Sequence, residues 1–541
     1  MRDQLVTNNA LFVPENAGYS IFSARSLACR NFNLAHCLPK GTETYPKGST
    51  MSELCTPESR EEFPKQFLVT RERLAPVQGW KQLQLGDYHV HLGAGIGATR
   101  VNEAKDRTKR EILIIGWFSY RSDFYPGKEP AELWLEETVE DIYPELTGRF
   151  AVLILEHNQL LCTSDAGAQF PVVYRTETGE LGSTPLVLGW TGALQKVPQS
   201  AAAFSRTDGT IWYPFGVTPY AGIERLLPQQ TVALSKHGVH LLARQPFRRP
   251  FLNVPQMYAM AQDFIAALCR SQGMLECHLT AGWDSRMVLS ASLPLKNRIS
   301  YLTYLAKGHT AHVDAEVADH IATRFDLSYQ KLPVKTPRQE DINRWLLRTS
   351  ECVFDSVTGL TRTIVDTYTH RYGLAGVGGE VGRAFYWNRR DTDVMGLTPE
   401  DLLGRLGFAG TGRALSLADK WLEPYRDHSR AHILDRAYID IRLGCWAGPS
   451  LGGHLVEKPT LSPFNSLALY ESMLALPEDY RLSGGFARDF ISQGSPDLAR
   501  IPVNRLTGFR RLRYLPREVA RILPKGAKTR LRRLLPSTAP A

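Results

Sequence analysis

Residues 278–291, HLTAGWDSRMVLSA, give the clearest indication of the fold. A strand-like run ending at Leu279 meets a loop of small and polar residues, 280–285, and a helical pattern follows. Backbone N–H groups in such a loop can approach a polyphosphate, while the Asp284 carboxylate can hold a magnesium ion on it. The same residues would equally suit an Asp-Ser N-cap on a core helix.

The segments around this loop alternate between helix and strand. Residues 257–271 form an amphipathic helical pattern, 274–280 and 298–305 are strand-like, and 314–327 are helical again. Alternation of this kind predicts βαβ units, and therefore a mainly parallel sheet covered by helices on both faces.

The chain before this region has a different pattern. Residues 66–243 contain short β-type runs spaced like the strands of a packed sheet structure, with one acidic helical candidate at 131–146, and a Pro-flanked linker follows at 244–255. We therefore expect a loosely structured extension (1–65), a strand-rich domain (66–245), an alternating α/β domain (250–510) and a basic tail (511–541).

Composition excludes several classes of protein. The 541 residues exceed the usual single-domain range, and 43% hydrophobic and 22% charged residues are typical of a globular chain. No apolar run approaches the length of a membrane span and the N-terminus lacks a signal-peptide pattern, so we expect a cytoplasmic protein. Eight cysteines without a CxxC pair argue against a disulfide scaffold and a structural zinc site.

The net charge of +9 is concentrated at the C-terminus. Residues 505–536 hold eleven Lys or Arg against one acid, a surplus of ten, so the rest of the chain carries −1. Leu, Val and Ile alternate with these cations, so the tail could lie on an anionic membrane surface, at the inner face of the membrane. A solvated basic terminus is the equal alternative, and we expect no nucleic-acid partner because only Tyr514 offers a stacking surface.

A second informative stretch is residues 373–387, GLAGVGGEVGRAFYW. Four glycines in seven positions permit close backbone approach to a ligand, and Glu380 among them could share a magnesium pyrophosphate. The ordinary alternative is a Gly-rich turn with a solvated Glu. Arg383, Tyr386 and Asp366 are the nearby polar candidates.

Both stretches resemble the asparagine synthetase superfamily, whose members adenylate a carboxylate with ATP. Residues 280–285 resemble the pyrophosphate loop (PP-loop) Ser-Gly-Gly-x-Asp-Ser, and residues 376–382 resemble the loop Gly-Glu-Gly-x-Asp-Glu. The resemblance implies ATP and Mg²⁺ as cofactors, with Asp284 and Glu380 as the metal ligands. It also implies nucleotide contacts by Thr280, Ala281, Gly282, Asp284, Ser285 and Gly379.

Further segments extend the resemblance. The helix with Asp314, Glu316 and Ala318 resembles the Asp-Glu-x-x-x-Ala helix of the family. Residues 462–491 and 504–509 are similar to the late family segments through Pro463, Phe464, Gly508 and Phe509.

Two departures from the family pattern concern the chemistry. Val377 stands in place of the first Glu, which leaves the general base open, and the pyrophosphate-binding Lys is missing among residues 483–485. The resemblance then implies Glu380, Arg383 and Arg488 as catalytic residues, with Arg488 or Arg505 as the replacement cation. Arg can hold phosphate oxygens in a bidentate manner but cannot shuttle a proton as Lys can.

The strand-rich domain resembles the glutaminase domain of the same family through residues 146–175 and 222–228. The implied fold is an N-terminal, Ntn-hydrolase-like β-rich sandwich followed by a parallel-sheet, adenine-nucleotide α-hydrolase-like synthetase domain. Glutamine hydrolysis in this family requires an N-terminal cysteine, whose free amine activates the thiol. Arg2 follows Met1 and no cysteine begins the strand near Gln66, so we expect a degenerate glutaminase.

The implied activity is that of a carbon–nitrogen ligase. It would adenylate a small-molecule, sugar or peptide carboxylate, release pyrophosphate, and pass the acyl group to ammonia or to an amine with release of AMP. Surface-glycan or natural-product biosynthesis is one setting, and a cyclase of the lasso-peptide or β-lactam type is an alternative. A catalytically decayed scaffold or binding protein is the alternative of another class.

Overall fold

The computed structural model describes residues 63–504, except 76–78, 105–109, 126–130, 198–203, 205, 207–208, 307–308, 368 and 370. The predicted extension up to residue 62 and the predicted basic tail lie outside the described residues. The described chain is a mixed α/β structure with several sheets, one of which is parallel.

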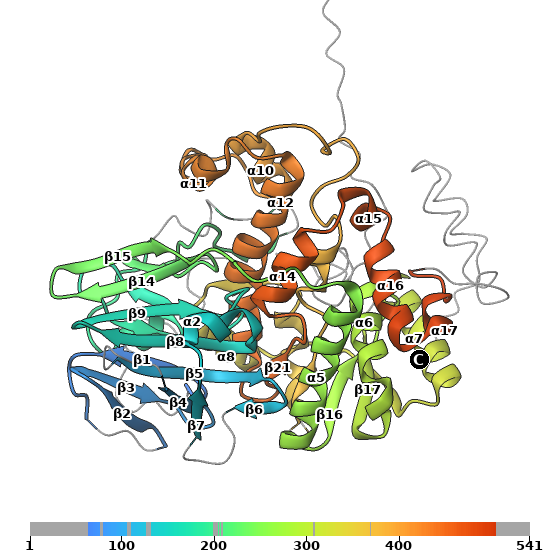
Figure 1. Cartoon of the computed structure of the whole chain (residues 1–541), viewed down its shortest axis with the longest axis horizontal. Coiled ribbons are helices and arrows are strands. Elements are labelled where there is room, and N and C mark those ends of the chain that lie inside the picture. The colour runs from blue at the N-terminus through green and yellow to red at the C-terminus, as the bar shows by residue number, and fades with distance from the viewer. Residues whose placement is uncertain are drawn as a thin grey trace, which may run out of the picture.

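The N-terminal half is built from two sheets, shown in blue to green in Figure 1. Side chains alternate in β1: Phe67 and Val69 join the main core, while Leu68 joins a smaller core with Phe63 and Leu186. The six-stranded sheet follows the order β13 (Ile223–Arg225), β10 (Val173–Arg175), β11 (Leu181–Gly182), β1 (Phe67–Thr70), β3 (Tyr88–Leu92) and β2 (Lys81–Leu85).

The second sheet has eight strands. Its order is β15 (Gly238–Ala243), β14 (Gln230–Ser235), β9 (Gln159–Ser164), β8 (Thr147–Glu156), β5 (Glu111–Tyr120), β4 (Ala98–Glu103) and β7 (Ala131–Leu135), with β6 (Asp123–Tyr125) paired to β5. Short helices α2 (Val139–Ile142) and α3 (Pro185–Leu188) complete this half. This half is therefore rich in strands, as predicted.

One sequence prediction in this half is wrong. Residues 131–146 were expected to be helical, but they begin with strand β7 and continue as α2 and the 3-10 turn Tyr143–Glu145. In β7, Leu133 and Leu135 are buried while Glu132 and Trp134 point to solvent. The sequence AELWL has a period of two as well as the helical preference of Ala, Glu and Leu, and pairing with β4 selects the strand.

The C-terminal half contains a five-stranded, all-parallel sheet, as predicted. Its order is β18 (Tyr329–Pro333), β17 (Ile299–Leu305), β16 (Leu275–His278), β20 (Gly373–Leu374) and β21 (Thr460–Leu461). The chain moves outward from β16 to β17 and β18, and later resumes on the other side of β16 with β20. The strand order therefore reverses between β16 and β20.

Most of the helices belong to the C-terminal half. The first helix, α5 (Val254–Gln272), begins at a capping box in which Asn253 and Gln256 form reciprocal hydrogen bonds. It ends at Gly273, whose φ of 79° stops the helix. The helices that follow, in chain order, are α6 (Trp283–Ser292), α7 (His309–Phe325), α8 (Gln339–Thr349), α9 (Thr361–Asp366), α10 (Pro399–Leu406), α11 (Gly412–Leu422), α12 (Arg430–Ala437), α13 (Gly448–Gly453), α14 (Leu467–Leu474), α15 (Glu478–Leu482), α16 (Gly485–Gly494) and α17 (Pro496–Ala499). Between α12 and α13 lies the π-helix η7 (Tyr438–Ala447). In the part of the chain that the structure describes, no helix has the length and apolar character needed to span a bilayer.

Buried polar contacts join the two halves. The Asp165 carboxylate accepts hydrogen bonds from the N–H groups of Phe150, Gly167, Gln169 and Phe170, and it also accepts from the amide of Asn465 at 2.8 Å. Because Asn465 follows β21, this carboxylate connects the β8–β9 hairpin to the parallel sheet. Figure 1 shows the two regions side by side around β21.

Candidate functional site

The strongest candidate site lies where the strand order reverses, at the carboxyl ends of β16 and β20. In open parallel sheets, ligands bind in the crevice at such a switch point. The loop 279–282 leaves β16 and the loop 375–382 leaves the adjacent β20. The two stretches singled out in the sequence are thus brought together by the fold.

The first loop has its N–H groups paired within the protein. The N–H of Thr280 donates to Ser285 Oγ at 3.1 Å, that of Ala281 to Asp314 Oδ1 at 3.1 Å, and that of Gly282 to Thr280 Oγ1 at 3.2 Å. The Ser285 hydroxyl therefore closes this turn from inside α6. The Asp-Ser N-cap of the ordinary interpretation is not formed, because the N-cap of α6 is Gly282, which makes no side-chain cap bond. Asp314, in the helix that resembles the Asp-Glu-x-x-x-Ala helix of the family, thus contacts the loop.

The second loop approaches the first so closely that side chains would not fit. A Cβ atom on Gly376 would lie 2.6 Å from the carbonyl carbon of Asp284, and one on Gly379 would lie 2.7 Å from Met287 Cε. Glycine is required at position 376, where the contact is with backbone, whereas at position 379 the contact is with the end of a flexible Met side chain that can move. Ser462, which follows β21, holds the loop by donating to the Val377 carbonyl at 2.6 Å.

A charged network connects the two loops. Arg383 donates from Nε to Asp284 Oδ1 at 3.1 Å and from Nη2 to Asp284 Oδ2 at 2.5 Å. Glu380 accepts the N–H of Gly378 at 3.0 Å and a hydrogen bond from Tyr438, the first residue of η7. Asp284 is 0% exposed and Glu380 3%, so both carboxylates are buried.

Burial and mutual repulsion disturb the ionisation of this network. The pKa of Glu380 is raised to about 7, first because it is buried and second because of the negative charge of Asp284, with Arg383 opposing both. Burial also raises the pKa of Asp284 against the opposing effect of Arg383. Two buried acids share one guanidinium, which leaves one negative charge uncompensated when both are ionised.

This donor set bears on the predicted magnesium site. Mg²⁺ in nucleotide sites usually takes one or two carboxylates together with phosphate oxygens and water. Asp284 and Glu380 supply two carboxylates and a surplus negative charge, so they fit such an ion, with Arg383 at present in contact with Asp284. Within the described ranges, no group of three or more His, Cys, Asp or Glu side chains is arranged for a metal by protein ligands alone.

Other predicted residues lie outside the network. Arg488 is on the exposed side of α16, where its guanidinium donates to the Ser483 carbonyl at 3.5 Å. Asp366 forms ion pairs with Lys335 and Arg362 at the end of α9. Arg505, the other candidate cation, falls outside the described residues, as do Gly508 and Phe509.

Aromatic side chains pack near both loops. Tyr386 packs in an aromatic cluster with Phe385 and Tyr438. Tyr438 was missed in the sequence, because nothing in the sequence YIDIRLGCWA indicates that its first residue reaches a loop about 60 positions earlier. Trp283, in the pyrophosphate-loop candidate, lies against Gly484, within the segment where the family Lys is missing.

Gln66 lies at the start of the strand where the resemblance would place a nucleophilic cysteine. This residue immediately precedes β1 and is buried, and its side-chain oxygen accepts from Thr184 Oγ1 at 2.7 Å and Ser183 Oγ at 3.2 Å. The cysteines among the described residues are buried free thiols, at positions 162, 269, 277, 352 and 445. Burial raises the pKa of Cys162 and Cys277 to about 12, so neither is an activated nucleophile.

Comparison with models of known protein families gives no match, and comparison with curated proteins gives none either. Among solved structures, the chain is similar to the allosteric regulatory enzyme of purine biosynthesis, with 8% identity and a TM-score of 0.20, over 42% of this chain and 57% of the other. It is similar to the glutamine phosphoribosylpyrophosphate amidotransferase of B. subtilis, solved with ADP and GMP, with 8% identity and a TM-score of 0.18 over 50% and 60%.

A third similar structure is the glutamine-dependent NAD⁺ synthetase of Acinetobacter baumannii, solved with ADP. Identity is 10% and the TM-score 0.15, over 40% of this chain and 41% of the other. The chain covers less than two thirds of each of these three proteins. Scores at this level carry no argument about fold or activity, so membership of the asparagine synthetase-like superfamily stays a prediction.

Proposed function

We propose that the chain is an ATP-dependent ligase that forms a carbon–nitrogen bond through an acyl adenylate, with release of AMP and pyrophosphate. The acceptor class is a small-molecule, sugar or peptide carboxylate, and the nitrogen comes from ammonia or from an amine. The observation that carries the proposal is the meeting of the Asp284 and Glu380 loops at the switch point of a parallel sheet.

Arg383 has the central role in this proposal. Its guanidinium now occupies both oxygens of Asp284, and a planar guanidinium can make the same paired contact with a phosphate. We infer that Arg383 exchanges Asp284 for phosphate oxygens when nucleotide binds. A Mg²⁺ ion bound with the nucleotide would supply positive charge against the charge that develops on the leaving pyrophosphate.

Glu380 would lie next to the Arg383 guanidinium during this exchange, with Tyr438 bonded to its carboxylate. The N–H of Gly378 and the hydrogen bond from Tyr438 fix the orientation of the Glu380 carboxylate. In this proposal Glu380 holds the Mg²⁺ ion together with Asp284. The group that takes the proton of the incoming amine stays open, because Val377 stands in place of the first Glu of the family loop.

A second candidate function is favoured by a different observation. The N–H groups of residues 280–282 already have partners in the protein, and protein atoms crowd Gly376 and Gly379. A closed site of this kind suits a scaffold or binding protein in which both ancestral activities have been lost.

Calorimetry of ATP binding with and without Mg²⁺ separates the two candidates. The ligase proposal requires ATP binding that depends on Mg²⁺ and is lost in Glu380→Gln. Glu132→Gln, on the exposed face of β7, is the matched control and should bind as the parent chain does. Failure of the parent chain to bind Mg-ATP would favour the scaffold.

The reaction itself is tested by AMP release with a panel of candidate acids, with and without ammonium. If AMP release requires both an acid and ammonium, ammonia is the nitrogen source. If AMP is released with a peptide that carries both a carboxylate and an amine, and without ammonium, the enzyme is a cyclase. Asp284→Ala should abolish substrate-dependent pyrophosphate release, and retention of that release would refute the proposed role of the loop.

A further inference from the structure

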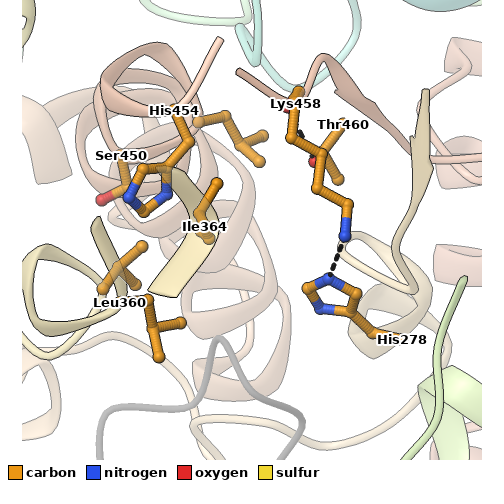
Figure 2. A pocket seen from close by; sticks show the side chains of 9 residues that line it. His278, Leu360, Ile364, Ser450, His454, Lys458 and Thr460 are labelled. Carbon is orange, nitrogen blue, oxygen red and sulfur yellow. Dashed lines mark hydrogen bonds between the residues drawn. The ribbon is translucent and has the colours of Figure 1, made fainter. Parts of the chain in front are cut away.

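The two halves of the chain are closely packed around β21. Arg149, in β8, is buried and donates to the carbonyl of Thr460, in β21, at 3.3 Å. The pocket beside Thr460, where Lys458 Nζ lies 3.3 Å from His278 Nε2, has a volume of about 20 Å³, the scale of one water molecule (Figure 2). A displacement at such a boundary is passed on to the neighbouring side chains, because a dense interior leaves little room to absorb it.

Tyr470, in α14, joins the strand-rich half to the chain that follows β21. Its side chain is buried, and its hydroxyl donates to Asn465 Oδ1 at 3.1 Å and accepts from Gln169 Nε2 at 3.3 Å. Asn465 in turn donates to Asp165 Oδ1 at 2.8 Å. The hydroxyl of Tyr470 is therefore held, directly and through Asn465, by residues 165–170 of the strand-rich half.

The same hydroxyl lies against the Glu380 loop. A Cβ atom on Gly378 would overlap the hydroxyl oxygen of Tyr470 and would lie 3.1 Å from two of its ring carbons. Gly378 has a φ of 96°, in the left-handed region that favours glycine, and its N–H donates to Glu380 Oε2 at 3.0 Å. The peptide that orients the Glu380 carboxylate is thus packed directly on Tyr470.

The strand-rich half also holds η7, which provides the other partner of Glu380. Arg225, in β13, donates to the carbonyl of Cys445, in η7, at 3.0 Å. Tyr438, the first residue of η7, bonds the Glu380 carboxylate. Both hydrogen bonds to this carboxylate therefore come from segments that are fixed against the strand-rich half.

From these contacts we propose that Tyr470 is a positioning residue for Glu380, through which Gln169 and Asn465 hold the Glu380 carboxylate in place. Its importance for catalysis rests on the proposed ligase function, whereas the positioning itself is a property of the folded chain and needs no nucleotide. The strand-rich half would then have a task that requires no glutaminase nucleophile.

Replacing Tyr470 by Phe removes the hydroxyl and keeps the ring. Gly378 then loses the contact that orients its N–H, so its hydrogen bond to the Glu380 carboxylate should weaken and the pKa of Glu380 should rise further. The titratable groups that face Glu380 are Asp284 from α6, Arg383 from its own loop, Tyr438 from η7 and Tyr470 itself.

Urea denaturation of the full-length chain at pH 5 and pH 8 measures this effect as the ratio of the two unfolding constants. Because a raised carboxyl pKa makes stability fall with rising pH, the ratio in Tyr470→Phe should be about fivefold larger than in the parent chain, as expected for losing one hydrogen bond to an ionised group. Gln169→Met keeps the size of the side chain, removes the donor to Tyr470, and should give a smaller rise.

Both rises should vanish in the Glu380→Gln background, since an effect that arose from Asp165 would persist there. Tyr301→Phe is the matched control, because this buried hydroxyl bonds Ser292 away from the Glu380 loop. It should lower stability equally at both pH values and leave the ratio unchanged.

An unchanged ratio in Tyr470→Phe or in Gln169→Met would overturn the proposal, and so would a rise that persists with Glu380→Gln. These measurements contain no nucleotide. Failure of the parent chain to bind Mg-ATP would therefore refute the ligase and leave the test of Tyr470 unaffected.

Discussion

Replacing Glu380 by Gln should stabilise the protein at alkaline pH while removing its proposed function. The carboxyl group is 3% exposed, and its pKa is raised from 4.5 to about 7. Holding this group ionised at pH 8 therefore lowers the free energy of unfolding by about 3 kcal/mol. Gln keeps the size of the side chain and an oxygen that can accept the Gly378 N–H.

The sign of the pH dependence follows from the direction of the shift. A carboxyl group whose pKa is higher in the folded state binds more protons there, so stability falls as pH rises from about 4.5 to 7. The gain in the free energy of unfolding from Glu380→Gln should be under about 1 kcal/mol at pH 5 and about 3 kcal/mol at pH 8.

Urea denaturation at both pH values measures this difference, with Glu132→Gln as an exposed control that should show no change. A gain of equal size at pH 5 and pH 8 would refute the assignment of the raised pKa to Glu380. A loss of stability at pH 8 would show that the carboxylate is a net stabilising partner of Arg383. In either case the surplus-charge reasoning behind the magnesium site would fail.

Three further changes test other parts of the structure. Arg383→Met leaves two buried carboxylates without a counter-charge and should lower the free energy of unfolding by about 3–5 kcal/mol, a loss that adding Asp284→Asn should partly restore in urea denaturation. Gly376→Ala places a Cβ against the Asp284 backbone and should cost about 1–3 kcal/mol, seen as a lower melting temperature, whereas Gly404→Ala, where the added atom meets open space, should not. Removing residues 505–541 should abolish co-sedimentation with anionic vesicles, and equal behaviour of the two chains would remove the membrane interpretation of the tail.

The parallel sheet and its loops could be predicted because their signals are local. Helices and strands alternate from residue 257 onward, and dense glycine marks a backbone under close approach. Residues 131–146 show the limit of such signals. The five residues AELWL have good helical propensity and also a period of two, and only the partner strand β4 decides between these.

The partners of the charged residues could not be predicted, because they depend on contacts between distant segments. Arg383 meets Asp284 across 99 positions of sequence, and Arg488, assigned from its place in a family pattern, lies on an exposed helical face instead. Similarly, a glycine-rich loop indicates close approach without indicating what approaches. At Gly376 the approaching group is the backbone of Asp284, at the start of α6.

The charge balance of the network differs from that of several other buried ion pairs in the described chain. Lys458 with Glu276 and Arg481 with Asp435 each join one base to one acid, whereas Arg110 also serves two carboxylates, Glu103 and Glu140. At the switch point, one guanidinium serves two carboxylates, and the second carboxylate has a raised pKa for that reason as well as for its burial. A network retained only for packing gains nothing from the second acid, since replacing it by a neutral side chain would be stabilising. In the proposed function, a site that takes up a divalent cation with a polyphosphate would use both carboxylates, and this is the role that we propose for Glu380.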